Sequence, residues 1–263
     1  MSNNKEILNN KSNTKNRIKR TTAKTPDKFV ISDYKSSFED KKKIKNQSNI
    51  QKKTSAIKSK KLSISSKDWL LRQLNDPLVQ KAKDMGYRSR ACFKLIEINN
   101  KYSVIKNAKT ILDLGCAPGS WTEVCKKLNS NARIVACDLL KIDPIVNVEF
   151  ICGDFSNEDI QNQILSKANL FDVIVSDIAP NTTGDFESDH IKIINICEEV
   201  FYFAKKFLKQ NGNLVIKIFM GSKEKEFVLI LKNYFSKVSY FKPKSSRTES
   251  KEIYLVCLNY LKN

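Results

Sequence analysis

The stretch that decides the fold of this chain is Thr110-Ile111-Leu112-Asp113-Leu114-Gly115-Cys116-Ala117-Pro118-Gly119-Ser120-Trp121. An apolar run ends in an acid, a tight turn with glycine and proline follows, and a helical pattern begins at once. A strand, a glycine turn and a helix in this order predict a nucleotide-like ligand held above a parallel sheet. The turn alone does not identify that ligand.

Strand and helix patterns alternate from this stretch to the end of the chain, which is typical of a doubly wound, mostly parallel α/β fold. We expect strands at 110–114, 133–138, 148–152, 173–177, 214–218, 238–241 and 253–258, and helices at 120–128, 158–167, 189–208 and 223–234. The polar stretch 242–251 has no helical pattern. The last two strands should therefore form a hairpin, with the last strand antiparallel to the others.

A short helical prelude, residues 67–102, precedes the sheet. A first helix is expected to end at Leu74. Pro77 opens a second helix, because proline is tolerated at the first helical position, and Gly86 ends it. A third helix spans about 91–101.

Residues 1–66 carry 18 Lys and Arg against 5 Asp and Glu, in a chain of 263 residues with a formal charge of +19. They contain no glycine, few aromatics and no sustained period, so they cannot bury enough apolar surface to offset the entropy of ordering. We expect a disordered basic tail here, followed by one domain over 67–263. An organelle transit sequence and an unselected appendage are the alternatives for the tail, although its acids are unusual in a transit peptide.

The basic excess suggests a polyanionic partner, with nucleic acid as the first candidate. A general preference for Lys and Asn in this sequence is the plain alternative. No apolar run is long enough to span a bilayer, and the start of the chain lacks the apolar segment of a secretion signal. We therefore expect a soluble, cytoplasmic protein with no membrane partner. A monomer is the default, because periodicity indicates no spare apolar surface.

Cysteine and histidine usage argues against a metal site. The seven cysteines are scattered and never form a Cys-x-x-Cys pair, which is typical of reduced thiols. The single histidine, His190, weakens both a metal site and a Ser-His-Asp triad. We expect no metal.

Three carboxylates follow three predicted strands: Asp138, Asp154 and Asp177. The carboxyl ends of parallel strands meet at the edge of the sheet where ligands bind, so these side chains should lie close together. Asp138 comes 19 residues after Gly119, near the spacing at which an acid accepts from ribose hydroxyls. Asp154 suits an adenine amino group, and Trp121 suits packing on the same ligand. For any one acid, helix capping or a solvated turn is the ordinary explanation.

The turn itself does not suit a dinucleotide. It has two glycines, Gly115 and Gly119, where a dinucleotide turn has three, and Pro118 removes an amide that a pyrophosphate would use. A nucleoside without phosphates, such as S-adenosylmethionine, fits better.

Four polar residues are expected beside that ligand: Lys94, Asp177, Lys217 and Glu252. Lys217 is the most informative, because it interrupts an apolar strand and a buried ammonium requires partners. Carboxylates would keep it charged, whereas a sulfonium would favour the neutral amine. A neutral amine can act as general base toward a ribose 2′-hydroxyl. A lysine on an edge strand that extends to solvent is the structural alternative.

Five motifs resemble the FtsJ family of ribosomal RNA 2′-O-methyltransferases, also called RlmE or RrmJ. They are 69–77 (WLLRQLNDP), 86–91 (GYRSRA), 113–121 (DLGCAPGSW), 176–184 (SDIAPNTTG) and 242–247 (KPKSSR). The likeness covers about residues 66–260, with the motifs in the right order and spacing. Two residues of the turn depart from the family pattern: Cys116 and Ser120 stand where the family usually has Ala and Gly.

The resemblance implies a Rossmann-like methyltransferase fold with a seven-stranded sheet whose last strand is antiparallel. It also implies S-adenosylmethionine as the methyl donor, and as the acceptor a uridine ribose in the A-loop of large-subunit (23S) ribosomal RNA. By position, the family's catalytic tetrad falls on Lys94, Asp177, Lys217 and Glu252. Its cofactor contacts fall on Gly115, Gly119, Trp121, Asp138, Asp154 and Asp177.

An RNA face is expected beside the tetrad, from Arg72, Arg88, Arg90, Lys242, Lys244 and Arg247, with phosphate contacts that make affinity depend on salt. Two other functions share these features. One is 2′-O-methylation of tRNA or of an mRNA cap. The other is a non-catalytic RNA-binding role in ribosome assembly, which loss of a tetrad residue would have favoured.

Overall fold

A seven-stranded sheet organises the computed structural model, which describes residues 75–180 and 183–261. The strands are β1 (Thr110–Leu114), β2 (Arg133–Asp138), β3 (Val148–Cys152), β4 (Phe171–Ser176), β5 (Leu208–Phe219), β6 (Phe235–Phe241) and β7 (Glu252–Tyr260). The tail 1–66, Arg72 and the expected helix ending at Leu74 lie outside the described residues.

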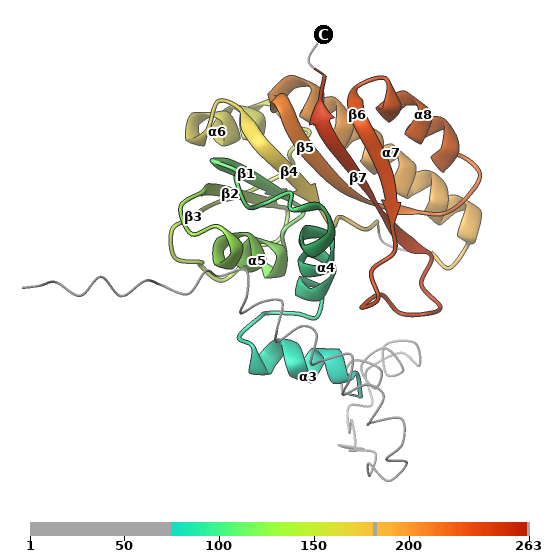
Figure 1. Ribbon diagram of the computed structural model, residues 1–263, viewed down its shortest axis with the longest axis horizontal. Coiled ribbons are helices and arrows are strands. Elements are labelled where there is room, and N and C mark those ends of the chain that lie inside the picture. Colours follow the sequence, from blue (N-terminus) through green and yellow to red (C-terminus); the bar gives the residue numbers. More distant parts are fainter. Residues whose placement is uncertain (1–74, 181–182, 262–263) are drawn as a thin grey trace, which may run out of the picture.

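The strand order is β3-β2-β1-β4-β5-β7-β6. Every neighbouring pair is parallel except β5–β7 and β6–β7, so β7 alone runs against the other strands. In Figure 1 the arrowhead of β7 points to the C-terminus, while that of β6 points the opposite way. The predicted α/β class, the seven strands and the terminal antiparallel hairpin are therefore confirmed.

β5 begins at Leu208 and not at the expected 214. Its register against β4 shifts between Phe171, which faces Leu208, and Val173, which faces Asn213. Leu208 is buried in the core, whereas Gln210 and Asn211, which follow it in the strand, are exposed. Because residues 209–213 are mostly polar, their sequence shows no strand pattern, and the first part of β5 was not predicted.

The helices are α3 (Pro77–Asp84), α4 (Cys92–Tyr102), α5 (Ser120–Leu128), α6 (Glu158–Lys167), α7 (Phe186–Phe207) and α8 (Glu224–Lys232). Side chains that accept from backbone amides start three of them: Asp76 from Leu78 for α3, Asn157 from Asp159 for α6 and Asp185 from Ser188 for α7. α7 begins three residues before the predicted 189, because the carboxylate of Asp185 accepts from the amide of Ser188 and caps the helix there.

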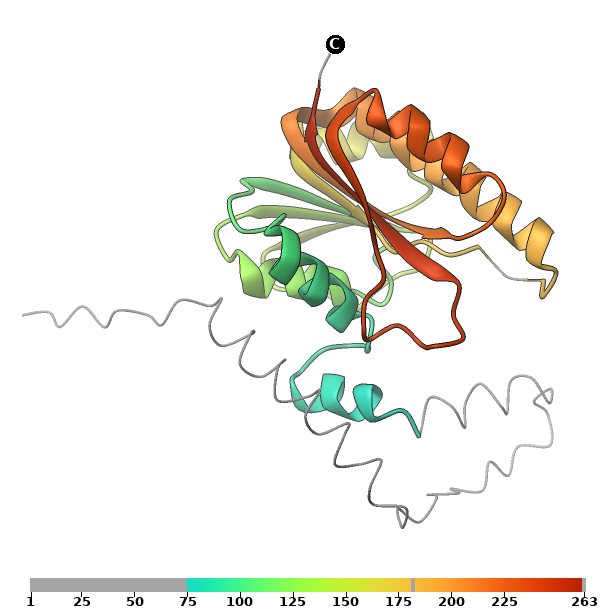
Figure 2. The same ribbon diagram turned by 45° about the vertical axis from the view of Figure 1, so that its right-hand side comes forward.

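Helices cover both faces of the sheet. One core contains α6, α7 and α8 together with inward residues such as Leu112 and Ile216. The other contains α3, α4 and α5 together with Ile111 and Val215. Because neighbouring residues of one strand point to opposite faces, both sides of the central strands are apolar. Figures 1 and 2 show the resulting three layers, with α4 and α5 on one side of the sheet and α7 and α8 on the other.

Candidate active site

The carboxyl-terminal edge of the central strands brings the four tetrad residues together. Lys217 lies on β5 and Asp177 directly follows β4, and Nζ of Lys217 is 3.1 Å from Oδ1 of Asp177. Lys94 lies on α4 and Glu252 begins β7, and Nζ of Lys94 is 2.8 Å from Oε1 of Glu252. The site thus consists of two adjacent ion pairs supplied by four different elements.

Lys217 is an internal residue of the sheet. β5 has β4 on one side and β7 on the other, so the alternative of an edge lysine does not apply. The side chain is only 7% exposed, and its ammonium also donates to the backbone carbonyl of Asp177 at 2.5 Å. A carboxylate and a carbonyl together compensate for burying the charge.

Asp177 remains ionised in spite of its burial. Burial raises its pKa, but the charges of Lys217 and Lys94 lower it, and hydrogen bonds lower it further, so the pKa ends below its ordinary value. One of these bonds comes from the hydroxyl of Tyr254, which donates to Oδ1 at 2.6 Å. Burial and, to a smaller extent, the charge of Asp177 raise the pKa of Tyr254. The phenol therefore keeps the proton that it donates.

Tyr254 was not among the predicted site residues. It lies two positions after Glu252 on β7, and alternate residues of a strand share one face of the sheet. It also faces Lys217 directly in the β5–β7 pairing. The alternation in Glu252-Ile253-Tyr254 is therefore the sequence signal that could have identified it.

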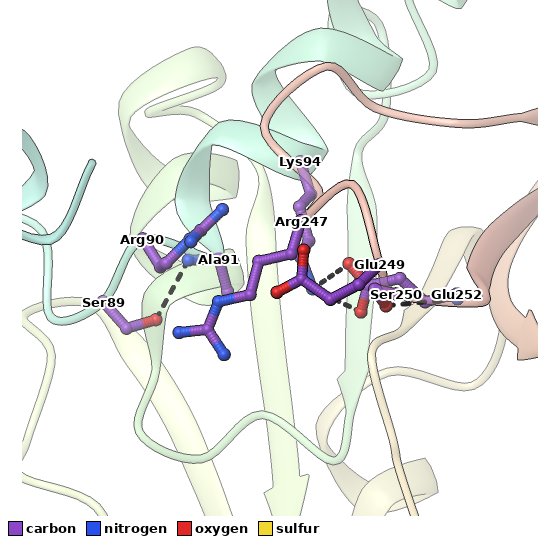
Figure 3. Close-up of a pocket in the computed structure, with 8 residues that line it drawn as sticks. All are labelled: Ser89, Arg90, Ala91, Lys94, Arg247, Glu249, Ser250 and Glu252. Atoms are coloured by element: carbon purple, nitrogen blue, oxygen red, sulfur yellow. Dashed lines mark hydrogen bonds and ion pairs between the residues drawn. The ribbon is translucent and has the colours of Figure 1, made fainter. Parts of the chain in front are cut away.

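A hollow of about 400 Å³ opens beside the Lys94–Glu252 pair (Figure 3). It is lined by Ser89, Arg90, Ala91, Lys94, Arg247, Glu249, Ser250 and Glu252. The segment before α4 supplies one side, and the segment between β6 and β7 supplies the other. Arginine, lysine and hydroxyl donors around such a hollow suit the phosphates and hydroxyls of a nucleotide.

Arg90 and Arg247, both expected on the RNA face, line this hollow. Arg90 forms an ion pair with Asp76 and donates to the carbonyl of Ser245. Arg247 lies 3.9 Å from the same Asp76 carboxylate. The Nη2 atom of Arg247, which makes this approach to Asp76, is buried and makes no hydrogen bond to the described residues.

Lys242 and Lys244, also expected on the RNA face, lie on the segment between β6 and β7. The ammonium of Lys242 donates to the carbonyls of Ser250 and Glu252, the latter at 2.7 Å. The backbone amide of Lys244 donates to the carboxylate of Glu97. Both residues therefore shape the segment that holds Glu252.

Glu97 is a second residue that the sequence did not reveal. It is 7% exposed on α4, and its two carboxylate oxygens accept from the amides of Lys244 at 2.6 Å and Ser245 at 2.7 Å. A bidentate carboxylate thus ties the β6–β7 segment to the helix that carries Lys94. Since the partners are 147 and 148 residues apart in the chain, no local pattern predicts the contact.

The guanidinium of Arg88 is committed to the protein itself, unlike the exposed RNA contact expected for it. It pairs with Glu123 of α5 at 3.0 Å and donates to the carbonyl of Pro118 at 2.9 Å. It also donates to the carbonyls of Asp143 and Pro144 after β2. Arg88 therefore joins the glycine turn to the loop after β2, on the side of the expected cofactor.

The glycine turn is packed closely against neighbouring side chains. Gly115 has φ +70° and a side chain there would lie 2.1 Å from Cγ1 of Ile178, while Gly119 has φ +107° at the start of α5. Glycine adopts such positive φ values without the steric penalty of other residues. Glycine at these two positions thus allows both the positive φ values and the close packing of the turn.

Asp138 and Asp154 face the same edge. Asp138 accepts from the amides of Ala117 and Leu140, each at 2.8 Å, and Asp154 accepts from the amide and hydroxyl of Ser156 through one oxygen. A carboxylate has about four acceptor positions, so both retain capacity for a ligand's hydroxyl or amino group. Acceptors fit the nucleoside of S-adenosylmethionine and disfavour a phosphate.

Trp121, which was expected to pack on the cofactor, is buried among other residues of the protein. The side chain is 2% exposed, its Nε1 donates to the carbonyl of Ala91 at 3.0 Å, and the ring packs on Tyr254 with centroids 5.5 Å apart. It therefore connects α5 with the segment before α4 and with the tyrosine that holds Asp177.

Asp113, at the base of the turn, is fully buried. Its Oδ2 accepts from Thr122 at 2.6 Å, whereas its Oδ1 has no hydrogen-bond partner among the described residues. Burial, together with the nearby charges of Asp177 and Asp138, raises its pKa to about 7 in spite of the Thr122 bond. Asp113 can therefore carry a proton near neutral pH.

The two departures from the family pattern leave the turn intact. Cys116 is 4% exposed, and burial raises the pKa of its thiol, so it is an unreactive core residue. The hydroxyl of Ser120 donates to the hydroxyl of Ser89 at 2.8 Å and adds a link between α5 and the lining of the hollow.

No helix within residues 75–180 and 183–261 is long and apolar enough to cross a membrane. The same part of the chain contains no group of three or more His, Cys, Asp and Glu that could hold a metal ion.

Known proteins are similar to this chain in sequence and in fold. A model of the FtsJ-like methyltransferase family matches residues 87–260. Ribosomal RNA large subunit methyltransferase E of Rickettsia akari is 47% identical over 208 residues, which is 76% of this chain and 92% of that one. The protein of the same name from Rickettsia canadensis is 46% identical over 211 residues, with the same shares.

A crystal structure described as a ribosomal RNA methyltransferase of Plasmodium falciparum has a TM-score of 0.62 and 34% identity, and it covers 67% of this chain and all of that one. The fold and the matches together define a Rossmann-like methyltransferase. Within that class, the chain belongs to the FtsJ-like methyltransferase family.

Proposed function

We propose that this chain transfers a methyl group from S-adenosylmethionine to the 2′-hydroxyl of a uridine ribose in the A-loop of large-subunit ribosomal RNA. The names of the relatives from Rickettsia support ribosomal RNA as the substrate. The observation that carries the chemical part of the proposal is the buried Lys217–Asp177 pair at the edge of the sheet where the acid-lined turn lies.

The residues around the turn would hold the methyl donor. Asp138 would accept from its ribose hydroxyls, Asp154 from its adenine amino group, and the 115–119 turn would approach its methionine part through the backbone. When bound, S-adenosylmethionine supplies a methyl group on a positively charged sulfur. The negative charge of Asp177 would be favourable beside that sulfur.

The positive sulfur of the bound donor would favour the neutral amine form of Lys217, and this amine would remove the proton from the 2′-hydroxyl as the oxygen attacks. The 2′-oxygen would take the methyl group that S-adenosylmethionine supplies, the donor would leave as a neutral thioether, and the hydroxyl proton would end on Nζ of Lys217. Asp177 holds Nζ in place through its carboxylate and its carbonyl. Lys94 and Glu252 line the adjacent hollow and would position the ribose. The leaving group is a neutral thioether, so the step itself needs no metal.

Lys217→Ala tests this role, with Lys232→Ala on the exposed surface of α8 as the matched control. We expect the first variant to lose methylation of large-subunit ribosomal RNA, with cofactor affinity within a few-fold of the wild type by calorimetry. The control should retain both. Near-normal turnover of Lys217→Ala would contradict the general-base role.

The substrate is tested separately by mapping ribose methylation in RNA from cells with and without this protein. Loss of one uridine 2′-O-methyl group in the A-loop is the expected result. Loss of a methyl group from tRNA or an mRNA cap would favour that alternative acceptor. An unchanged map would favour a non-catalytic role in ribosome assembly.

A further inference from the structure

A second basic hollow lies at the opposite edge of the sheet from the tetrad. Its volume is about 500 Å³, and its lining comes from the starts of β1, β2, β4 and β5: Lys109, Thr110, Arg133, Ala168, Asn169, Leu170 and Lys209. Parallel strands that end at the catalytic edge begin at this one. With a rise of about 3.3 Å per residue, the two edges are roughly 17–20 Å apart.

A neighbouring hollow of about 400 Å³ extends this one past the end of α5, and Arg133 lines both. Its other lining residues include Lys126, Ser130, Asn131 and Asn147. We call the two hollows together the basal groove. It offers ammonium, guanidinium, hydroxyl and amide donors along one edge of the protein, which is the donor set that phosphate oxygens accept from.

The charge of the basal groove is mostly uncompensated. Lys209 is paired with Asp172 at 2.9 Å, and Glu149, which also lines the neighbouring hollow, is paired with Lys167 at 3.1 Å. The remaining three cations of the basal groove, Lys109, Lys126 and Arg133, form no ion pair with a carboxylate in the part of the chain that the structure describes. An anionic partner would supply the opposite charges that these three cations lack.

Two of these cations are also held in position. Lys126 donates to the carbonyl of Ser130 at 2.8 Å, and Arg133 donates to the carbonyl of Lys167 at 2.6 Å. A carbonyl fixes the direction of a side chain without neutralising its charge. Immobilised donors lose less conformational entropy when a ligand arrives than free surface lysines do.

We propose that the basal groove binds the phosphate backbone of a second segment of large-subunit ribosomal RNA, separate from the segment whose ribose reaches the tetrad. The inference rests on the proposed function and names a further contact of the same substrate. Because the two edges are on opposite ends of the sheet, one nucleotide in the catalytic hollow cannot occupy both. A folded RNA can occupy both edges at once. The protein would therefore bind such an RNA more tightly than a short fragment that reaches only the catalytic hollow.

The test variant replaces Lys109, Lys126 and Arg133 with Gln, and the matched control replaces the exposed Lys225, Lys232 and Lys237 with Gln. Both remove three positive charges. Each protein is assayed with a short hairpin that carries only the acceptor loop, with protein-free large-subunit RNA and with intact large subunits. Melting temperature and cofactor affinity establish that both variants are folded.

For the groove variant on protein-free large-subunit RNA, we expect KM to rise on the order of tenfold at unchanged kcat. The slope of log affinity against log salt should become shallower by about two to three, because each phosphate contact contributes about 0.7–0.9. The short hairpin should be methylated at the wild-type rate. The control variant should show much smaller changes with every substrate.

An unchanged KM and salt slope on the long RNA would overturn the proposal. An equal loss on the short hairpin would also overturn it, because the substitutions would then act on the catalytic hollow. A loss confined to intact subunits would indicate an acidic ribosomal protein as the partner and would overturn it as well. If the wild type methylates none of the three substrates, the proposed function fails, whereas filter binding of the long RNA still tests the basal groove.

Discussion

The hydroxyl of Tyr254 and the cation of Lys217 converge on one oxygen, Oδ1 of Asp177, at 2.6 and 3.1 Å. This arrangement makes Tyr254 a positioning residue for the tetrad. Tyr254→Phe should lower kcat by about tenfold, since a hydrogen bond to a charged group contributes about 1.5–3 kcal/mol. The loss of activity on acidification should begin at a higher pH, because the pKa of Asp177 rises without this donor.

Tyr260→Phe is the control, because its hydroxyl donates to the carbonyl of Lys205, outside the tetrad. Single-turnover rates between pH 5 and 9 measure both effects. An unchanged profile in Tyr254→Phe would show that the Lys217 pair alone holds Asp177.

The contacts of Arg88 predict an effect on the cofactor and not on RNA. Arg88→Lys cannot reproduce the fork that joins Glu123 to the carbonyl of Pro118, so cofactor affinity should fall by about tenfold. KM for RNA should change little. Calorimetry with S-adenosylmethionine and steady-state kinetics separate the two. A raised KM for RNA at unchanged cofactor affinity would support the RNA contact expected from the sequence.

Glu97 holds the β6–β7 segment through two direct hydrogen bonds. Glu97→Gln retains one acceptor oxygen, so the amide of either Lys244 or Ser245 loses its partner. Hydrogen exchange at these two amides should become faster, and KM for RNA should rise several-fold at unchanged cofactor affinity. Glu226→Gln on the exposed face of α8 is the control. Equal exchange in the two variants would exclude this role.

Asp113 makes stability depend on pH. Its pKa is about 7 in the folded protein against 3.8 when unfolded, so between these values the folded state holds a proton that the unfolded state has released. Stability should therefore fall as pH rises from about 4 to about 7, by at most about 1.4 kcal/mol per pKa unit. Asp113→Asn keeps an acceptor for Thr122 without the charge. It should match the wild type near pH 4.5 and exceed it near pH 8.

Urea unfolding at several pH values measures this difference. Asp185→Asn is the control: a hydrogen bond from Ser188 lowers the pKa of Asp185, so its contribution changes only at acid pH. Parallel stability curves for the wild type and Asp113→Asn would show that Asp113 is ionised throughout.

Local sequence patterns predicted those features of the fold that depend on residues close together in the chain. Alternation of strand and helix identified all seven strands and the antiparallel last strand, because side-chain period and turn residues act over a few positions. The acids after β2, β3 and β4 share one edge as predicted, since parallel strands align their ends. The interruption of an apolar strand by Lys217 likewise predicted a buried cation with partners.

The sequence by itself therefore determined the fold class, the edge of the sheet where the strand-end acids gather and the four residues that meet there. Only the tertiary structure decided which groups hold them: Tyr254 on Asp177, Glu97 on the β6–β7 segment, and Arg88 on the loops of the cofactor side. These contacts join residues 35 to 148 positions apart. Hydrogen bonds of that kind depend on where the packed sheet brings two side chains, and no pattern within one segment encodes that position.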